Sequence, residues 1–397
     1  MLKLTCIPTS IRHRIEPLRS QFHCSHFLVF SWLLTLQIVF QGQATLKALS
    51  RHMALPYYLL PRFLTASYWY TPKLWLWFVH KVLSIFPAPL DRICYVVADS
   101  TVKPKRGKLN PLNKKSKKSA EEPSGWLFGL HIIVLSLQWS CWRIPIAFEI
   151  IRQKDDPHYL NENALFRKML SQAIIPTWAK TVIVTADAAY ASKENFRTIK
   201  TLGWFYVIAC AKTWNLADGS PLKERLAKLQ RNQFKQTWIP STDGKRRRFF
   251  HVRMERHNLK HLGDVSVIFS KTRRNTPLKK TKVLLTNLPE NVIVRDILLI
   301  YQRRWHTEVL FKELKSGLGL GEHQVTKDMG RIERSVAISL LAYLFLLRWH
   351  LEEQRFHKPN WSLFDAKQRF TWDVVKEHFS NSKQKYNSNT GRDRRIA

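Results

Sequence analysis

The order of hydrophobic segments between residues 91 and 210 constrains the fold more than any other feature of the chain. A β-rich run, RICYVVADST, is followed by two apolar stretches, 126–139 and 141–151, that are typical of an antiparallel pair of strands joined by a tight turn. Then come a helical segment (NENALFRKMLSQAI), a buried strand (TVIVTADAAY), a second helix (SKENFRTIKTLG) and a last strand (WFYVIACAK). Three strands, helix, strand, helix and strand indicate an α/β domain.

This order is the order of a ribonuclease H-like core, which is the fold class that we predict. The segments on either side complete the expected organisation. We expect a helical N-terminal region (1–90), the first part of the core (91–210), a β-rich basic insertion (211–285), two helices that complete the core (286–357) and a basic, partly disordered tail (358–397).

Charge points to a polyanionic partner. The chain has 65 Lys and Arg against 29 Asp and Glu, a formal net charge of +36. Nucleic acid fits this excess, because phosphates neutralised by cations release counterions; an anionic membrane is the competing partner. The longest apolar run, 27–40, is too short to span a bilayer comfortably and predicts a buried helix. Two short helices expected at 46–55 fit a helix-turn-helix or a plain bundle equally well.

The cysteines restrict the class of protein further. There are five, and no two of them form a Cys-x-x-Cys pair. An odd number without such pairs argues against a disulfide scaffold or a zinc ribbon and favours a reducing compartment.

Three carboxylates are candidates for catalytic residues because of their positions in the predicted elements. Asp99 and Asp187 each close an apolar run, where a side chain can emerge from a rigid strand at the sheet edge. Glu308 lies in YQRRWHTEVLFKELKS, which we interpret as part of one long helix ending at Gly317. At roughly 100° per residue, Tyr301, Arg304, Glu308 and Lys315 fall within an arc of about 80° on that helix.

Such a set of acids suits divalent cations. Mg²⁺ prefers oxygen ligands and is commonly held by carboxylates plus substrate phosphates, and two ions can activate an attacking oxygen and stabilise a leaving one. The alternative is that Glu308 forms a surface ion pair with Lys312, four residues on. Asp155 and Asp156 are a rival pair of acids, but before Pro157 they are more typical of a turn.

At these residues the chain resembles the DDE transposases of bacterial insertion sequences, in the group with a Tyr-x2-Arg-x3-Glu-x6-Lys signature. Tyr301, Arg304, Glu308 and Lys315 match that spacing at every position. VVADSTVKPKRGK, VTADAAYASKENF and LLTNLP followed by IYQRRWHTEVLFKELK resemble the three catalytic regions of the group. The resemblance covers about residues 90–345, and residues 1–90 and the tail match only loosely.

The resemblance implies a magnesium-dependent enzyme of DNA transposition and recombination. It implies Asp99, Asp187 and Glu308 as catalytic residues that bind two Mg²⁺ ions, for which Mn²⁺ substitutes. It implies binding of terminal inverted repeats, strand cleavage, and strand transfer by the freed 3′-hydroxyl in cut-and-paste transposition. The rival hypotheses are a ribonuclease H-like endonuclease without strand transfer and a non-catalytic, transposase-derived DNA-binding protein.

The resemblance also implies partners and a location. Double-stranded DNA, both transposon ends and target, is the expected partner, with a homodimer on paired ends, no membrane, and a prokaryotic cytoplasm where the protein associates with the nucleoid. The candidate DNA contacts are Tyr301, Arg304, Lys315, Lys103, Lys105, Arg106, Arg246, Arg247 and Arg248. Trp214 and Trp238 are candidates for stacking on a flipped base.

Overall fold

The computed structural model describes residues 4–53, 55–66, 69–86, 88–105, 112–117, 126–241, 244–322, 328–353 and 362–393. These residues divide into two compact units. The first combines the chain before residue 88 with the chain after residue 310, and the second is formed by Ala88–Arg106 and Leu112–Leu310.

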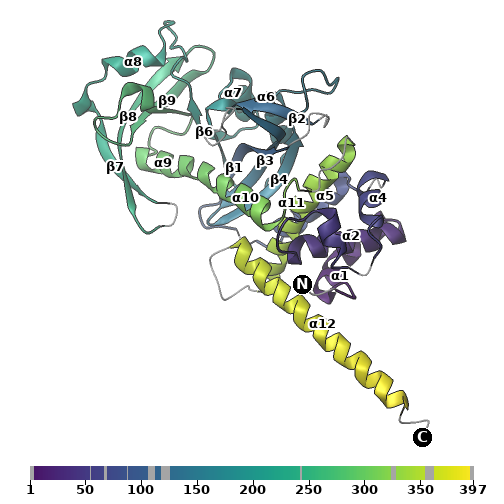
Figure 1. Ribbon diagram of the computed structural model, residues 1–397. Helices are drawn as coiled ribbons and strands as arrows, with labels where there is room; N and C mark the ends of the chain where they lie inside the picture. Colours follow the sequence, from purple (N-terminus) through teal and green to yellow (C-terminus); the bar gives the residue numbers. More distant parts are fainter. Residues whose placement is uncertain are drawn as a thin grey trace. The chain divides into compact units, whose positions relative to one another are not determined.

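The second unit contains one mixed sheet, with ten strands among the described residues (Figure 1). Its order is β2-β3-β1-β5-β6-β10-β9-β8-β7, and β4 also pairs with β3. β1, β5 and β6 are parallel to one another, whereas the remaining pairings are antiparallel. The strands are β1 (Ile93–Pro104), β2 (Asn113–Lys117), β3 (Trp126–Trp139), β4 (Trp142–Ile150), β5 (Thr181–Ala186), β6 (Phe205–Cys210), β7 (Lys235–Pro240), β8 (Arg247–Leu259), β9 (Gly263–Lys271) and β10 (Lys282–Thr286).

The predicted order of the core is confirmed. β1, β3 and β4 are followed by α6 (Glu162–Ser171), β5, α7 (Lys193–Thr201) and β6. Asn161 caps α6 by accepting from the backbone N–H of Ala164 at 2.9 Å. After α7, Gly203 takes a φ of 72°, a conformation that glycine adopts without strain and that ends the helix.

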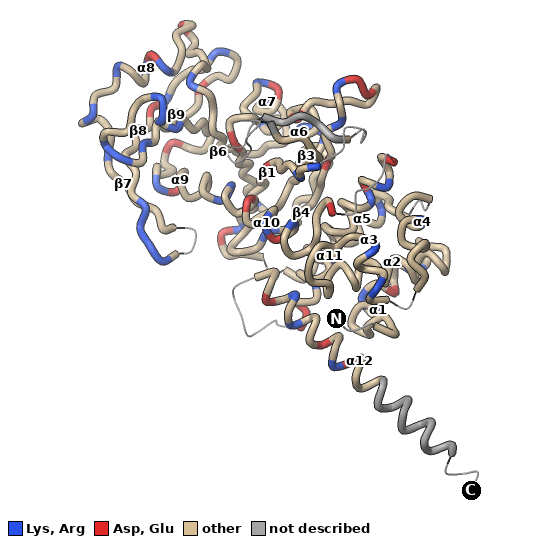
Figure 2. Tube along the Cα trace, in the orientation of Figure 1, with Lys and Arg blue, Asp and Glu red and all other residues tan. Residues whose placement is uncertain are grey.

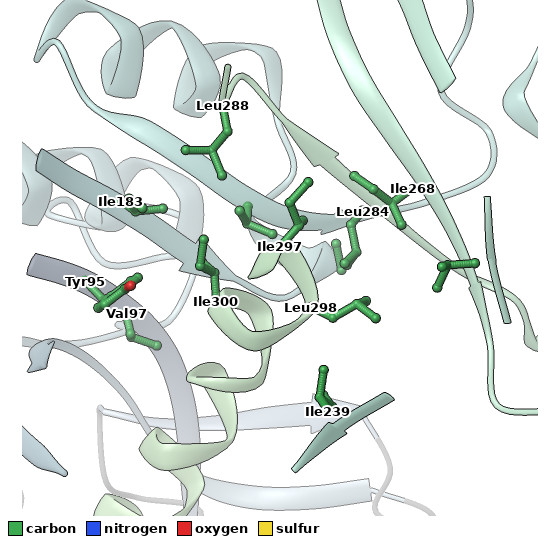
Figure 3. Packing of buried hydrophobic residues seen from close by; sticks show 13 residues of the cluster. Tyr95, Val97, Ile183, Ile239, Ile268, Leu284, Leu288, Ile297, Leu298 and Ile300 are labelled. Atoms are coloured by element: carbon green, nitrogen blue, oxygen red, sulfur yellow. The ribbon is translucent and has the colours of Figure 1, made fainter. Parts of the chain in front are cut away.

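Helices cover both faces of the sheet around these strands. On one face, Phe196 of α7 packs against Tyr206 of β6, with ring centroids 4.7 Å apart. On the other face lies α9 (Val294–Gln302), whose Ile297, Leu298 and Ile300 are buried. Figure 3 shows these side chains among strand residues of the same hydrophobic cluster, which are Tyr95, Val97, Ile183 and Leu284. Burial of aliphatic side chains contributes about 1.5–3 kcal/mol each, so this cluster holds α9 firmly on the sheet.

The segment interpreted as one long helix is two helices. α9 ends at Gln302, and α10 (Arg304–Gly317) starts after a tightened turn in which the Arg303 N–H donates to the Ile300 carbonyl at 3.1 Å. The Arg303 guanidinium lies 4.0 Å from the centre of the Tyr95 ring and donates to the Ser140 carbonyl. These contacts of Arg303 lie at the break between the two helices. The hydrophobic periodicity of the sequence does not indicate that break.

Strand lengths also differ from the expectation. β1 does not end at Asp99 but continues to Pro104, because β3 pairs with it as far as Gly129. A Cβ on Gly129 would stand 2.1 Å from the Lys103 carbonyl oxygen, so the close approach requires glycine there. β2 lies between β1 and β3, where the sequence analysis predicts no strand. The insertion, which also contains the short α8 (Leu222–Lys228), extends the core sheet through β7, β8 and β9.

Within the insertion, a buried carboxylate joins α8 to β8. Glu255 accepts hydrogen bonds from Arg225 of α8 and from Arg253 and His257 of its own strand. Burial alone would raise the pKa of Glu255, but these hydrogen bonds outweigh it and lower the pKa to about 2. The folded state therefore gains stability from the ionised carboxylate above the ordinary pKa of 4.5 and loses it as the pH falls toward 2.

We expect Glu255→Gln to destabilise the protein at pH 7 by on the order of 2–3 kcal/mol, because it removes this linkage. The difference from wild type should shrink as pH falls through the range from about 4.5 to 2. Denaturant unfolding at several pH values measures the difference in unfolding free energy between the variant and the wild type. Glu290→Gln is the matched control, because Glu290 is exposed and pairs only at the surface with Arg256. Equal losses for the two variants would contradict the prediction.

The first unit is helical. It contains α1 (Thr9–Ile15), η1 (Glu16–Gln21), α2 (Cys24–Val39), α3 (Leu46–Ser50), α4 (Leu59–Ala66), α5 (Pro72–Leu83), the end of α10, α11 (Met329–Glu353) and α12 (Leu363–Asp393). The buried helix predicted at 27–40 is confirmed as α2, while α12 occupies most of a tail that was expected to be partly disordered. Among the described residues α11 alone is long and apolar enough to cross a membrane; 83% of its most apolar window is buried inside the protein, as in the core helix of a soluble protein.

Candidate active site

Asp99 and Asp187 lie on neighbouring strands at matching positions. β1 and β5 run in parallel with Val97 opposite Thr185, and each aspartate comes two residues later. Asp187 directly follows β5, as predicted, and caps the η2 turn (Ala188–Tyr190) by accepting from the Ala189 N–H at 2.8 Å. Asp99 instead lies within β1. The parallel pairing therefore brings two carboxylates together from positions far apart in the chain.

Arg304 connects Asp99 to Glu308. It is the first residue of α10; its Nη1 donates to Asp99 Oδ2 at 2.8 Å and its Nη2 to Glu308 Oε1 at 2.6 Å. The side chains of Arg304 and Asp99 are 18% and 13% exposed, so this pair is largely shielded from water. The partner of Glu308 is thus a cation that also reaches an aspartate of the sheet.

The environment of Asp99 favours a nearby cation. Burial raises the pKa of Asp99 to about 6, although Arg304 and the Ser100 N–H act in the opposite direction. The charges of Asp187 and Glu308 raise it further, so both carboxylates are close enough to repel that of Asp99. A cation among them relieves that repulsion.

A cavity of about 670 Å³ opens beside these acids. Asp187 and Glu308 line it together with Tyr301 and Arg304, while Asp99 is joined to it through Arg304. The structure thus gathers the three predicted acids and two residues of the spacing signature, although the signature is divided between α9 and α10. Lys315 lies in the last turn of α10, in the part of that helix that belongs to the first unit.

Three lysines of this cavity were missed by sequence reasoning: Lys212, Lys280 and Lys282. Lys282 begins β10 and Lys212 follows β6, two strands that pair with Val283 opposite Cys210. The Lys282 ammonium lies 4.9 Å from the centre of the Tyr301 ring, and partial loss of solvent, then Arg304 and Arg248, lower its pKa. No sequence motif places these lysines near the acids. Their position follows from the pairing of β10 with β6.

The donor set is of the kind that divalent cations accept, namely carboxylate oxygens. Within the described part of the chain, no three carboxylate, imidazole or thiol groups are arranged to hold a metal ion as they stand. The Arg304 guanidinium occupies the space between Asp99 and Glu308 and shows that one cationic group can contact both. The donor chemistry of these residues suits a divalent ion, in a place where the Arg304 guanidinium supplies the positive charge.

The other candidates for DNA contact lie at several places. Lys103 lies four residues after Asp99 on the same face of β1, and Lys105 directly follows the strand. Both lysines are half-buried, and Arg106 lies outside the described residues. Arg246, Arg247 and Arg248 are exposed at the start of β8, and Figure 2 shows the β7–β8 hairpin lined by Lys and Arg. Asp156 accepts from the His158 N–H at 2.7 Å, so the rival pair of acids forms a turn, as predicted.

The two tryptophan candidates differ in their surroundings. Trp238 lies against two guanidinium groups, those of Arg247 at 4.5 Å and Arg295 at 4.2 Å from its ring centre. Trp214 packs edge-to-face on Phe196 and lines a separate cavity of about 470 Å³ with Lys193 and Lys260.

Comparisons with known proteins show the family and the fold. The family model of the transposase DDE domain matches residues 93–345, which include Asp99, Asp187 and Glu308. The chain is similar to the piggyBac transposase, whose structure is a cryo-EM synaptic complex with hairpin DNA, at a TM-score of 0.51 and 10% identity over 91% of this chain and 73% of that chain. That likeness shows the ribonuclease H-like fold. No curated protein matches. By the extent of the family match, the chain belongs to the family defined by the transposase DDE domain.

Proposed function

We propose that this protein is the DNA transposase of an insertion sequence, in the group with the Tyr-x2-Arg-x3-Glu-x6-Lys signature. It binds terminal inverted repeats and catalyses strand cleavage and strand transfer in cut-and-paste transposition. The observation that carries the proposal is the meeting of Asp99, Asp187 and Glu308, from two strands and a helix, beside a cavity lined by cations.

We assign the three acids to metal binding. DDE transposases generally use divalent metals. When bound, two Mg²⁺ ions would activate the attacking oxygen and stabilise the leaving oxygen of the phosphodiester. Asp99 and Asp187 would be held by the sheet and Glu308 by α10, so each ligand comes from a rigid element. Mn²⁺ is expected to substitute.

The cations around the acids would bind the DNA backbone. Arg304 presents a fork that can grip a phosphate with two hydrogen bonds, and Lys282 and Lys212 would neutralise neighbouring phosphates as point charges. Tyr301 would help to position Lys282 in this surface, because the Lys282 ammonium lies over the Tyr301 ring. Lys315 remains a candidate contact to the transposon end, by its place in the signature.

The insertion would hold the DNA that flanks the cut. The exposed Arg246, Arg247 and Arg248 suit phosphate contacts, as do the half-buried Lys103 and Lys105 at the far end of β1. Of the two tryptophans, we favour Trp214 for stacking on a flipped base, because it lines an open cavity with two lysines while Trp238 already lies against two guanidinium groups.

The partners follow from this function. Transposon ends and target DNA are the substrates, and a homodimer on paired ends would let two active sites act together. A prokaryotic cytoplasm, with the protein associated with the nucleoid, is the proposed location. The similar piggyBac structure is a synaptic complex with hairpin DNA, which supports a test for a hairpin intermediate here.

Strand transfer tests the proposal directly. Purified protein is incubated with Mg²⁺, a supercoiled donor carrying the inverted repeats that flank its gene, and a target plasmid. Pre-cut ends with free 3′-hydroxyl groups form a second substrate. Joining of these ends to the target is the expected result. Cutting of the donor without joining of pre-cut ends would instead identify an endonuclease, and end binding without either reaction would identify a DNA-binding protein.

We expect end binding to weaken steeply with salt. If the protein makes six to ten phosphate contacts, its affinity should fall on the order of 10³- to 10⁵-fold between about 50 and 200 mM salt. Replacing Arg246, Arg247 and Arg248 together by alanine should reduce the log–log slope by about 3, since each phosphate contact contributes about 0.9. Fluorescence anisotropy with labelled ends measures both slopes. A flat plot for wild type would mean that the charge serves another partner.

A further inference from the structure

A set of polar side chains, which the proposed chemistry does not use, lies beside both aspartates of the site; one of them is buried and three are half-buried. It comprises Ser100 of β1, His131 of β3, Glu162 at the start of α6 and Tyr190 at the end of η2. Because side chains alternate along a strand, Ser100 points to the face of β1 opposite Asp99. These four residues therefore support the site from behind the sheet.

Tyr190 ties the turn that carries Asp187 to α6. Its hydroxyl donates to Glu162 Oε1 at 2.7 Å, and its ring packs on Phe166 of the same helix with centroids 4.9 Å apart. The side chain is 1% exposed. Burial, and then Glu162, raise the pKa of Tyr190 well above 10, so the hydroxyl stays protonated and remains a donor.

The backbone of the same turn is held as well. The Tyr190 carbonyl accepts from Asn195 Nδ2 at 2.8 Å, and Asn195 Nδ2 also donates to Asn163 Oδ1 at 2.6 Å. Asn195 is fully buried on α7. The first turns of α6 and α7 thus fix a short η2 turn only three residues long.

Glu162 reaches the strand of Asp99 through His131. Glu162 Oε2 lies 3.9 Å from His131 Nε2, and that nitrogen is hydrogen-bonded to Ser100 Oγ at 3.0 Å. Ser100 is the residue next to Asp99, and His131 is opposite Val102 in the β1–β3 ladder. One carboxylate therefore contacts the supports of both aspartates.

We propose that Glu162 and Tyr190 are positioning residues that set the spacing of Asp99 and Asp187. The inference rests on the proposed function, in which these two acids bind metal together. Ligands of a metal site must be held within about 0.5 Å of the productive geometry, and loss of an outer partner typically costs about 10- to 100-fold in metal affinity or activity.

Tyr190→Phe is the informative variant, because it keeps the ring on Phe166 and removes only the donor. We expect the Mg²⁺ concentration for half-maximal nicking to rise about 10- to 100-fold, with end binding unchanged. Mn²⁺ binding to the DNA-free protein, followed by electron paramagnetic resonance, should weaken in parallel. Glu162→Gln should retain near wild-type metal dependence, since an amide oxygen still accepts from Tyr190, whereas Glu162→Leu should behave like Tyr190→Phe.

Tyr206→Phe is the matched control. Tyr206 is also a fully buried tyrosine, packed on Phe196, and its hydroxyl has no hydrogen-bond partner within the described residues. It should leave metal dependence unaltered. The positioning role is overturned if Tyr190→Phe changes only the melting temperature, or shifts neither Mg²⁺ dependence nor Mn²⁺ binding relative to Tyr206→Phe.

The same assays separate this inference from the proposed function. Absence of metal-dependent cleavage by the wild-type protein counts against the transposase itself. In that case Mn²⁺ binding still decides the positioning role, which requires weaker binding by Tyr190→Phe than by wild type and by Tyr206→Phe.

Discussion

Single alanine substitutions of Asp99, Asp187 or Glu308 are expected to reduce strand cleavage on the order of 10³-fold or more. Each removes one of the three proposed oxygen ligands, and bound metal ions would contribute several kcal/mol of transition-state stabilisation, about tenfold in rate per 1.4 kcal/mol. End binding should change little, because the cations that line the cavity remain.

Nicking of a supercoiled donor measures strand cleavage, and fluorescence anisotropy of labelled transposon ends measures end binding. Asp155→Ala is the control, since Asp155 is an exposed acid that precedes a turn outside the cavity. Near wild-type excision by any one of the three variants would remove that residue from the site. A parallel loss of end binding would show that the acid supports the fold of the DNA surface instead.

The convergence of the three acids could be predicted from the sequence, because local patterns carry that information. Asp187 follows a short, mostly apolar strand, and the spacing of Tyr301, Arg304 and Glu308 follows helical periodicity closely enough to place them on one side. That placement survives the break at Arg303, since all three residues line the same cavity. A local period thus predicts which side chains converge even where it does not predict the helix boundaries.

The lysines of the cavity could not be found in this way. Lys212 and Lys282 are 70 residues apart in the numbering and meet only because β10 pairs with β6. Likewise, Glu162 becomes a partner of Tyr190 only when α6 packs beside η2. Such contacts depend on long-range pairing, which a single sequence does not specify.

The length of β1 and the presence of β2 also depend on long-range strand pairing. Lys and Pro in VKPKRGK are typical of a loop, yet β3 is long enough to pair with β1 as far as Pro104 and then with β2. A partner strand thus overrides local propensity, and this places Asp99 within a strand rather than at its end.

Arg304→Lys is expected to lower cleavage about 10- to 100-fold although it conserves the charge. In the structure the guanidinium reaches two separate oxygens with two nitrogens, and in the proposed complex the same fork would grip a phosphate with two hydrogen bonds. The ammonium of a lysine is a point charge without this planar fork. Loss of one charge-assisted hydrogen bond costs about 1.5–3 kcal/mol, which corresponds to that range of rates. Arg303→Lys is the matched control, because Arg303 lies one residue away but points to Tyr95 and Ser140.

Glu308→Asp distinguishes the proposed role of Glu308 in metal binding from that of Arg304 in phosphate binding. Shortening the carboxylate by one methylene should change the ratio of activities in Mg²⁺ and Mn²⁺, because Mg²⁺ demands a more regular coordination geometry. Arg304→Lys should leave that ratio unchanged, since its proposed partner is phosphate. Nicking, second-strand cutting and strand transfer are scored separately in each metal. If Arg304→Lys equals wild type at every step and Glu308→Asp shows no metal dependence, the ion pair between these two residues is a surface contact of α10 and the acid must be sought elsewhere.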